Sequence, residues 1–446
     1  MRVAFYSHEA SAIAWARRLH DEGCDVLVYN EAQHAKKIGS GIVHLSPSKD
    51  TWLKWGLSDA TTIFFFDDSS NDAGAELAER LRRAGRRVIG AGKFMHRLEK
   101  DRAFGEQLAR SVGILCPPTK EFSDISSVVA FLKTNPRQEF GDGGWAWKPN
   151  KSLGCSSTFV SKGNDDMLEF LSYAQRMWGN SVSCIIQERI PGVALSTGRW
   201  FNGKSFVGPY EGTIEEKKAW DGDKGPATGC SLCLVWFYKG TPRVAEACKF
   251  AQLEALFRKN NAPPGLYDIN AIVDKRGAWF LEWTPRLGID SELNSQRGIR
   301  SLSQFLDNLE SGKDVSALFN DRRCYTSVRV SVPPYPCDEE GVKDLKSALK
   351  VPVLGADGLW DKHFVMSGIA LEKHGLEVVD PCGIVGVALA DGTSLPGMCK
   401  RIYEYLKDGL RIANVQYRTD AYDIIKKDLV DMAKNGWTST PVLRIV

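Results

Sequence analysis

The sequence predicts an α/β protein made of three domains. At 446 residues the chain is too long to fold around one compact core. Short apolar runs alternate with helical periodicity through the first part, which indicates a parallel sheet covered by helices. We expect this N-terminal α/β domain over residues 1–95, a central domain over residues 96–320, and a small C-terminal α+β domain over residues 321–446.

Composition and charge exclude several classes of protein. With 43% apolar and 25% charged residues, the chain has the composition of an ordered globular protein. Its net charge of +3 gives no electrostatic case for nucleic acid or a membrane as partner. The most apolar run, Ile63–Phe66, is far too short to span a bilayer, and the first residues hold no signal-peptide core. We therefore expect a soluble, cytoplasmic protein, with its oligomeric state left open.

The cysteines favour a reducing compartment. Their number, eleven, is odd, and their spacing is not typical of a disulfide framework. Cys230 and Cys233 form one CxxC pair, but a structural zinc needs two further ligands with similar spacing, and the sequence shows none.

Apolar periodicity predicts the individual elements. In the first two domains, strands are expected at Val3–Tyr6, Asp25–Tyr29, Ile63–Phe66, Val88–Ile89, Trp145–Lys148, Thr158–Val160 and Val182–Gln187, and helices at Ala10–Glu22, Ala73–Ala84, Leu98–Val112 and Asp166–Met177. A hairpin with strong alternation follows, with strands at Asp268–Asp274 and Trp279–Trp283. In the C-terminal part, strands are expected at Tyr325–Val332, Ile384–Leu389 and Ile412–Asn414, and helices at Leu395–Lys407 and Tyr422–Lys434.

A lysine at a strand end is the first candidate for chemistry. Lys148 ends an apolar strand and is followed by the small-residue loop PNKSLGCSS. A lysine beside such a loop can place a cation and backbone N–H groups around phosphate oxygens. The loop has neither of the common phosphate-binding spacings, so an ordinary turn after a surface lysine is the alternative.

The hairpin carries the second group of candidates. It places Asp268, Asn270 and Glu282 on neighbouring strands, with Arg286 and Asp290 shortly after. Hard oxygen ligands on adjacent strands suit Mg²⁺, and an arginine can neutralise charge on a transferring phosphoryl group. A solvated hairpin face is the alternative, but the tryptophans around Glu282 indicate an interior strand, where an unpaired carboxylate is costly.

The third candidate is the segment DGDKGPATG, Asp221–Gly229. It contains turn-forming residues at a density too high for a helix or strand. We expect either a loop that contacts substrate or an ordinary long surface loop.

These segments, in this order, resemble those of the phosphoribosylamine–glycine ligases of the ATP-grasp superfamily. DGDKGPATG is similar to the family's DGDxGPNTGGMG loop, and Phe280–Asp290 (FLEWTPRLGID) to its VLEFNxRxGDPE segment. Gly90–Lys93 with Arg97–Phe104 looks like the family's entry to the ATP-binding domain. Ile186–Gly192 resembles its hinge, and the segments Ile384–Leu389 and Tyr417–Asp420 resemble two motifs near its C-terminus.

The resemblance implies a pre-ATP-grasp domain, then an ATP-grasp domain with lobes at about 115–185 and 186–320. ATP and Mg²⁺ (or Mn²⁺) would be the cofactors, with small-molecule carboxylate and amine substrates. Lys148 and Arg286 would be catalytic, and Glu282 would hold the metal with Asn270 or Asp268. The nucleotide would contact Lys148, Lys151, Gly154, Ser156, Gln187, Glu188 and Ile190. Substrates would contact Asp221, Asp223, Gly225, Pro226, Thr228, Gly229, Arg286 and Asp290.

The first domain departs from the family pattern. Tyr6–Trp15 contains no glycine where the family has a glycine-rich turn, and the acids Asp67 and Asp68 replace its GPEAPL segment. These acids would repel a sugar phosphate, so Asp67 and Asp68 are instead candidates to contact an amine or amino-acid substrate. We therefore expect a ligase that works through an acyl-phosphate with an altered amine acceptor and with glycine or another amino acid as carboxylate. A divergent phosphoribosylamine–glycine ligase of purine biosynthesis and a non-catalytic nucleotide-binding protein are the alternatives.

Overall fold

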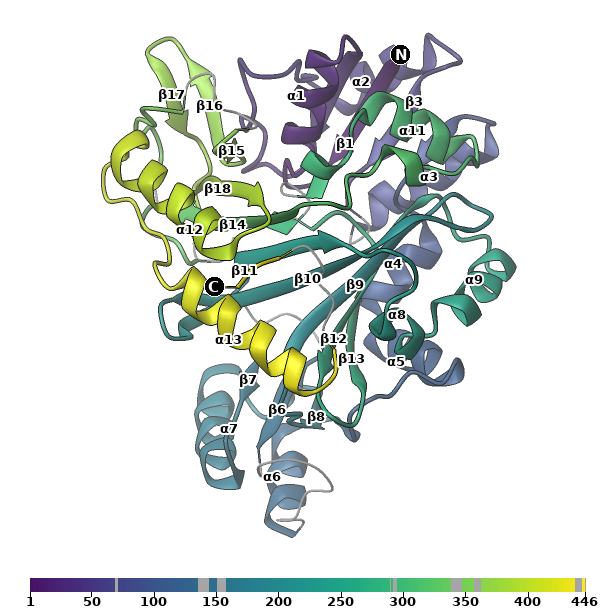
Figure 1. Cartoon of the computed structure of the whole chain (residues 1–446). Helices are drawn as coiled ribbons and strands as arrows, with labels where there is room; N and C mark the ends of the chain where they lie inside the picture. Colours follow the sequence, from purple (N-terminus) through teal and green to yellow (C-terminus); the bar gives the residue numbers. More distant parts are fainter. Residues whose placement is uncertain are drawn as a thin grey trace.

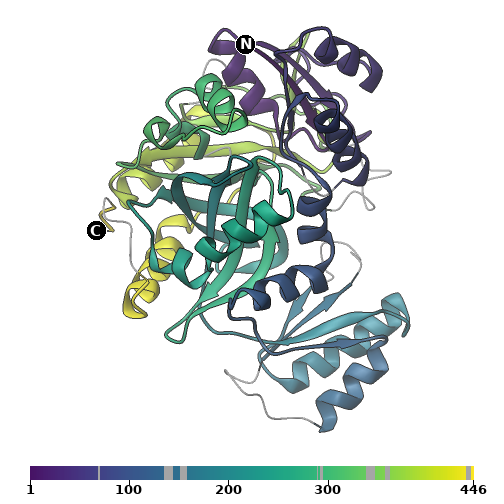
Figure 2. The ribbon, with the colours of Figure 1, turned by 90° about the vertical axis from the view of Figure 1, so that its right-hand side faces the viewer.

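The computed structural model describes residues 1–68, 71–134, 144–150, 158–288, 290–291, 295–337, 347–356, 362–437 and 443–445. A large antiparallel sheet forms the centre of the molecule (Figure 1). An N-terminal α/β unit lies against one end of it, and a small lobe projects from the other end, as the perpendicular view shows (Figure 2). The α/β class and the N-terminal parallel sheet predicted from the sequence are confirmed.

The N-terminal unit is a four-stranded parallel sheet of order β2-β1-β3-β4. Its elements are β1 (Arg2–Ser7), α1 (Ile13–Asp21), β2 (Asp25–Asn30), α2 (Lys49–Leu57), β3 (Ile63–Phe66), α3 (Asp72–Arg83) and β4 (Arg87–Ile89). β3 is buried along its whole length, as expected for a central strand covered by helices on both faces. The carboxyl ends of β1, β2 and β3 meet at one edge, where open α/β sheets bind ligands.

Two helices join this unit to the rest: α4 (Lys93–Lys100) and α5 (Arg102–Ser111). The sequence had predicted one helix, Leu98–Val112, and this is wrong. The break falls at Asp101, which leaves helical geometry and whose side chain accepts a hydrogen bond from the Phe104 amide at 3.0 Å. A carboxylate that caps a free backbone amide stabilises a new helix start at this point.

The small lobe consists of a four-stranded sheet of order β5-β8-β6-β7 covered by two helices. Its elements are β5 (Thr119–Phe122), α6 (Ile125–Thr134), β6 (Trp145–Pro149), β7 (Phe159–Val160), α7 (Asn164–Trp178) and β8 (Cys184–Glu188). Trp147 is fully buried against the helices, which fixes the orientation of β6 and therefore of Lys148, its next residue.

The large sheet has the order β13-β12-β9-β10-β11-β14-β18-β15. Its strands are β9 (Val193–Phe201), β10 (Phe206–Trp220), β11 (Lys224–Phe237), β12 (Gly265–Val273), β13 (Ala278–Thr284), β14 (Cys324–Ser331), β15 (Phe364–Met366) and β18 (Ile384–Gly392). Strands from residues after 320 therefore extend the same sheet as those before it. The domain boundaries themselves remain a prediction.

The remaining described elements lie around this sheet. They are α8 (Arg243–Ala247), α9 (Phe250–Lys259), α11 (Leu302–Glu310), β16 (Ile369–Glu372), β17 (Gly375–Val378), α12 (Leu395–Glu404) and α13 (Ala421–Lys434), with short helical turns η1 (Gln296–Gly298), η2 (Ser316–Leu318) and η3 (Tyr405–Gly409). Among the described residues, no helix has the length and apolar character needed to cross a bilayer.

Two further predictions are wrong. Asp221–Gly229 is not a long loop, because β10 and β11 form a hairpin and Lys224–Gly229 already belongs to β11. Turn-forming residues are tolerated there because the register is irregular near the hairpin tip. Ile412–Asn414 is not a strand, since the chain turns there and Asn414 has a φ of 57°. Asparagine tolerates this left-handed conformation better than most residues.

Candidate active site

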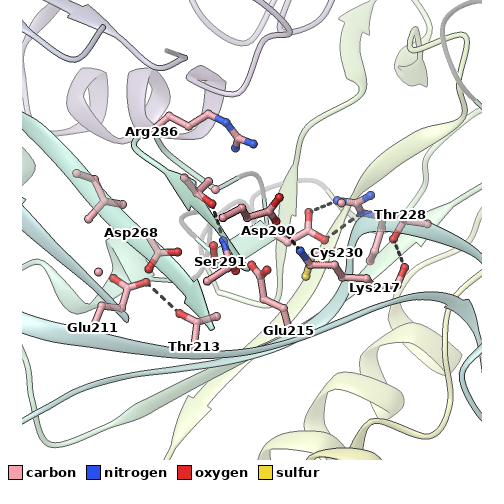
Figure 3. A pocket seen from close by; sticks show the side chains of 18 residues that line it. Glu211, Thr213, Glu215, Lys217, Thr228, Cys230, Asp268, Arg286, Asp290 and Ser291 are labelled. Atoms are coloured by element: carbon pink, nitrogen blue, oxygen red, sulfur yellow. Dashed lines mark hydrogen bonds and ion pairs between the residues drawn. The ribbon is translucent and has the colours of Figure 1, made fainter. Parts of the chain in front are cut away.

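A cavity of about 200 Å³ lies on one face of the large sheet (Figure 3). One wall is formed by alternate residues of β10, namely Glu211, Thr213, Glu215 and Lys217. Alternate side chains of a strand point to the same face, so this wall follows directly from the strand's pleat. The opposite wall comes from the predicted hairpin and the segment after it, with Asp268, Asn270, Glu282, Thr284, Arg286 and Asp290.

The predicted metal ligand Glu282 is paired with a lysine on the opposite wall. Lys217 Nζ lies 3.2 Å from Glu282 Oε1, and the two strands that carry them are not neighbours in the sheet. The Lys217 charge is the largest cause that lowers the pKa of Glu282 to about 2. Glu282 raises the pKa of Lys217 in turn, so both groups are charged at neutral pH.

Lys148 reaches the same region from the small lobe. Its ammonium donates a hydrogen bond to Gln187 Oε1 at 3.1 Å. Burial lowers the pKa of Lys148 to about 8, and the charge of Glu282 partly opposes that shift. Lys148 and Glu282 therefore lie within electrostatic reach of each other, although they come from the small lobe and the large sheet.

Arg286 is held at the boundary between the cavity and the helices that lead from the N-terminal unit. Its Nε donates to Glu99 Oε1 of α4 at 3.0 Å, and one Nη donates to the Leu287 carbonyl at 3.1 Å. Burial lowers the pKa of Arg286, but the charges of Glu99 and Asp68 outweigh burial and raise it overall. Asp68 of the N-terminal unit is thus close enough to influence the cavity.

Asp290, predicted to contact substrate, forms a buried ion pair. Two guanidinium nitrogens of Arg329 donate to its two carboxylate oxygens, each at 2.9 Å, and Arg329 also donates to the Tyr335 hydroxyl at 2.8 Å. Both members of the pair are almost completely buried. The pair joins the segment after β13 to β14 and closes one end of the cavity.

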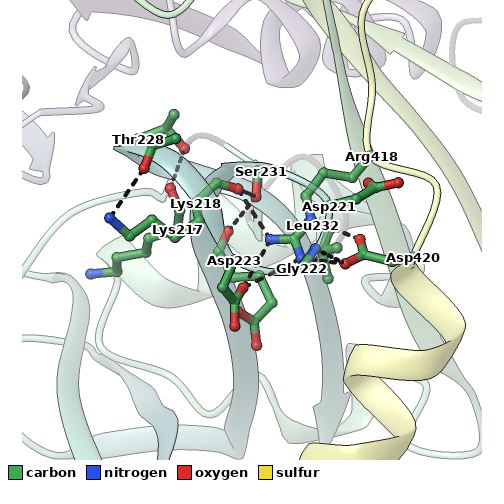
Figure 4. A network of polar contacts seen from close by, with 12 residues as sticks. Lys217, Lys218, Asp221, Gly222, Asp223, Thr228, Ser231, Leu232, Arg418 and Asp420 are labelled. Atoms are coloured by element: carbon green, nitrogen blue, oxygen red, sulfur yellow. Dashed lines mark hydrogen bonds and ion pairs between the residues drawn. The ribbon is translucent and has the colours of Figure 1, made fainter. Parts of the chain in front are cut away.

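The tip of the β10–β11 hairpin is tied to the C-terminal part of the chain (Figure 4). Arg418, fully buried, donates to the Lys218 carbonyl at 3.1 Å and lies 3.4 Å from Asp223. The Thr419 amide donates to Asp221 at 2.8 Å. The tip residues are therefore anchored outside the cavity, whereas Thr228 and Gly229 line it. Gly225 and Pro226, also predicted to contact substrate, lie at the start of β11 and do not line the cavity.

The predicted nucleotide contacts divide into two groups. Gln187, Glu188 and Ile190 are buried at the end of β8. The Gln187 side chain accepts a hydrogen bond from Lys148 and donates one from its amide nitrogen to the Thr119 hydroxyl at 3.0 Å. The second group, Lys151, Gly154 and Ser156, lies outside the described residues.

Asp67, predicted to contact substrate, is buried at the carboxyl end of β3. Its side chain accepts a hydrogen bond from the Ser7 hydroxyl, at the end of β1. Burial is the largest cause that raises its pKa to about 7.

The donor set fits a magnesium ion that is also bound by phosphates. Glu282 supplies a charged oxygen, and Thr284 and Asn270 lie beside it, joined by a hydrogen bond of 2.5 Å. The Asn270 carbonyl oxygen also accepts from the Ser196 hydroxyl at 2.5 Å. Within the described part of the chain, no three His, Cys, Asp or Glu side chains form a group that could hold a metal. Mg²⁺ typically uses one or two carboxylates with substrate phosphates, which is the arrangement that Glu282 offers.

The fold of the chain is the one found in ATP-grasp enzymes. No family model matches the chain. The crystal structure of phosphoribosylamine–glycine ligase from Thermotoga maritima matches with a TM-score of 0.70 and 17% identity, covering 94% of this chain and 100% of that one. The biotin carboxylase domain of the Hydrogenobacter thermophilus 2-oxoglutarate carboxylase, solved with MgADP, matches with a TM-score of 0.61 and 11% identity, covering 99% of this chain and 96% of that one.

In sequence, the chain is similar to phosphoribosylamine–glycine ligase. The Streptococcus pneumoniae enzyme of that name is 21% identical over 336 residues, which are 72% of this chain and 73% of that enzyme. The resemblance predicted from the sequence motifs is therefore confirmed.

Sequence reasoning missed the β10 wall, above all Lys217 and Glu215. The available signal was a run of four consecutive charged residues, Glu215–Lys218, in the segment GTIEEKKAW, which does not show the alternation of a strand. Glu215 lies deep enough that burial raises its pKa. Arg329 carried no comparable signal, since its partner Asp290 is 39 residues away.

Proposed function

We propose that the chain is an ATP-dependent ligase that joins a carboxylate to an amine through an acyl-phosphate, with Mg²⁺ as the metal. One observation carries this proposal. A carboxylate suited to a metal, Glu282, shares one cavity with the cations Lys217 and Arg286 and lies within electrostatic reach of Lys148. Polyphosphate chemistry needs this combination, because catalysis depends on positioning and neutralising phosphate charge.

The reaction has two steps. A carboxylate oxygen of the first substrate attacks the terminal phosphorus of ATP, and ADP leaves. The amine of the second substrate then attacks the acyl carbon, phosphate leaves, and the amine nitrogen loses a proton as the amide forms. Mg²⁺ would supply charge neutralisation at the phosphate oxygens. Lys148 and Lys217 would hold the phosphates, and Arg286 would steady the transferred phosphoryl group.

The N-terminal acids support an altered amine acceptor. Asp68 lies within electrostatic reach of Arg286, and Asp67 is buried at the carboxyl edge of the parallel sheet. Asp68, together with Asp67 in its ionised form, would attract a protonated amine and repel a sugar phosphate. We propose glycine or another amino acid as the carboxylate, and an acceptor other than phosphoribosylamine.

The test is ADP release with Mg²⁺-ATP, glycine and a panel of amines, together with transfer of ¹⁸O from labelled carboxylate to phosphate. We expect turnover that needs both substrates and the appearance of the label in phosphate. Glu282→Ala should abolish it, while Glu246→Ala, a substitution on α8 outside the cavity, should not. Absence of both turnover and ATP binding in the folded protein would refute the proposal. ATP binding without turnover, with biological activity unchanged in Glu282→Ala, would instead favour a non-catalytic nucleotide-binding protein.

A second candidate is phosphoribosylamine–glycine ligase itself, favoured by the similarity to enzymes of that name. Complementation of a purine-requiring strain distinguishes the two. Growth would identify the acceptor as phosphoribosylamine, whereas failure with well-expressed, folded protein would leave the altered acceptor as the better account.

A further inference from the structure

A second cavity, of about 430 Å³, is lined by an excess of basic side chains. Most of its lining residues come from the end of β18, the start of α12 and the segment before β14, elements that Figure 1 shows near one another. Its lining residues are Arg297, Arg323, Lys362, His363, Ala390, Asp391, Gly392, Thr393, Ser394 and Arg401. None of them lines the candidate active site, so the two cavities are separate.

One residue, Asp391, holds the three arginines, two through its carboxylate and one through its backbone carbonyl. Arg297 lies 2.9 Å from Asp391 Oδ1, and Arg323 is paired with Oδ2 of the same residue. Arg401 donates to the Asp391 backbone carbonyl at 2.8 Å. The guanidinium groups are therefore held together before any ligand arrives, which lowers the entropic cost of binding one.

The positive charge in this cavity is not balanced by its lining. Of the described lining residues only Asp391 is acidic, and it faces three arginines and Lys362. The pKa of His363 is lowered, first by burial and then by the positive charges of Lys362, Arg297 and Arg401. His363 therefore lies in a positive electrostatic potential. Like charges gathered in one place disfavour one another, and an oxyanion removes that cost.

The helix start at this cavity contributes little by itself. The Ser394 hydroxyl already accepts from the Gly397 amide at 3.3 Å, and the Leu395 amide donates to the Arg444 carbonyl at 2.9 Å. Recognition therefore depends on the guanidinium groups, whose planar, multiple donors match the oxygens of phosphate.

We propose that this cavity, which we call the basic cavity, binds a small molecule carrying a phosphate group, separately from the nucleotide in the active site. Its volume exceeds that of one phosphate and leaves room for an attached group. β14 connects the two sites, since Arg323 precedes this strand and Arg329 lies on it. Arg323 and Arg329 are six residues apart along the chain, which corresponds to roughly 20 Å in a strand.

The test is calorimetric titration of the full chain with inorganic pyrophosphate and with AMP, with citrate as a carboxylate probe. We expect Arg401→Gln to weaken phosphate binding about tenfold, the worth of one charge-assisted hydrogen bond. Arg300→Gln, which changes an arginine lining a different cavity, is the matched control and should bind as the wild type does. Arg286→Gln, in the active site, should also retain the binding.

Asp391→Asn gives a test with the opposite sign. It keeps the size of the side chain, and its amide oxygen and backbone carbonyl can still accept hydrogen bonds from the arginines. It removes the negative charge that competes with a bound anion, so we expect tighter pyrophosphate binding. This result holds even if Arg401→Gln fails to fold. Unchanged binding in both variants, or loss of all binding in Arg286→Gln, would overturn the proposal. Citrate binding as tight as pyrophosphate would overturn the assignment to phosphate. The experiment needs no turnover, so its outcome is independent of the proposed ligase activity.

Discussion

The charge of Lys148 makes nucleotide binding depend on pH in a predictable way. Burial lowers its pKa to about 8, so the ammonium loses its proton within the range where the protein can be studied. Lys217 and Arg286, whose pKa values are raised, stay charged over the same range. Of these three cations, Lys148 is therefore the one whose charge changes between pH 7 and pH 9.

The magnitude follows from the fraction of charged lysine. With a pKa of about 8, that fraction falls from roughly 90% at pH 7 to roughly 10% at pH 9. If the ammonium is needed to hold the phosphates, the affinity for ADP falls about tenfold as pH rises through this interval. The sign is fixed, because the protonated lysine attracts the anion and the neutral amine does not.

Calorimetric titration with ADP at several pH values is the assay, with two variants beside the wild type. Lys148→Arg stays charged and should show little change, which also corrects for titration of ADP itself. Lys148→Met should bind weakly at every pH. Two results would refute the role given to Lys148. In one, the ADP affinity of the wild type changes with pH as that of Lys148→Arg does; in the other, the wild type and Lys148→Met have the same ADP affinity at every pH.

Three further predictions concern the walls and supports of the cavity. Lys217→Met removes the largest cause of the low pKa of Glu282. Glu282 should then take up its proton at a higher pH, so that on acidification the variant loses binding of Mn²⁺ with ADP at a higher pH than the wild type. Loss of binding at the same pH in both proteins would count against the Lys217–Glu282 ion pair. Asp290→Asn leaves the Arg329 charge buried and should lower the free energy of unfolding by about 3–5 kcal/mol in urea titration, with a smaller loss in the double variant that also carries Arg329→Met. Arg418→Gln should speed amide hydrogen exchange at the β10–β11 hairpin tip, and equal exchange rates would show that the anchor does not restrain it.

The β12–β13 hairpin could be predicted because its information is local. Alternation on both sides of a short turn determined the pairing, and the structure pairs Asp268 with Thr284 and Asn270 with Glu282 across the two strands. Because side chains of a strand alternate between faces, the sequence was enough to gather these oxygen donors on one surface.

The other wall could not be predicted so directly. β10 and β11 are long strands, and their glycines, charges and irregular register hide the alternation that identifies a strand. The anchors of the site are non-local, since Arg418 is 195 residues from Asp223. Only the folded sheet brings such residues together, so periodicity within a short window carries no signal for them.

The position of the bound nucleotide tests the proposed mechanism most directly. A crystal structure with a non-hydrolysable ATP analogue and Mg²⁺ measures it directly. We predict the terminal phosphates between Lys148, Lys217 and Arg286, with the metal bound to Glu282 and to phosphate oxygens. A nucleotide bound elsewhere, or a metal that does not contact Glu282, would contradict the account.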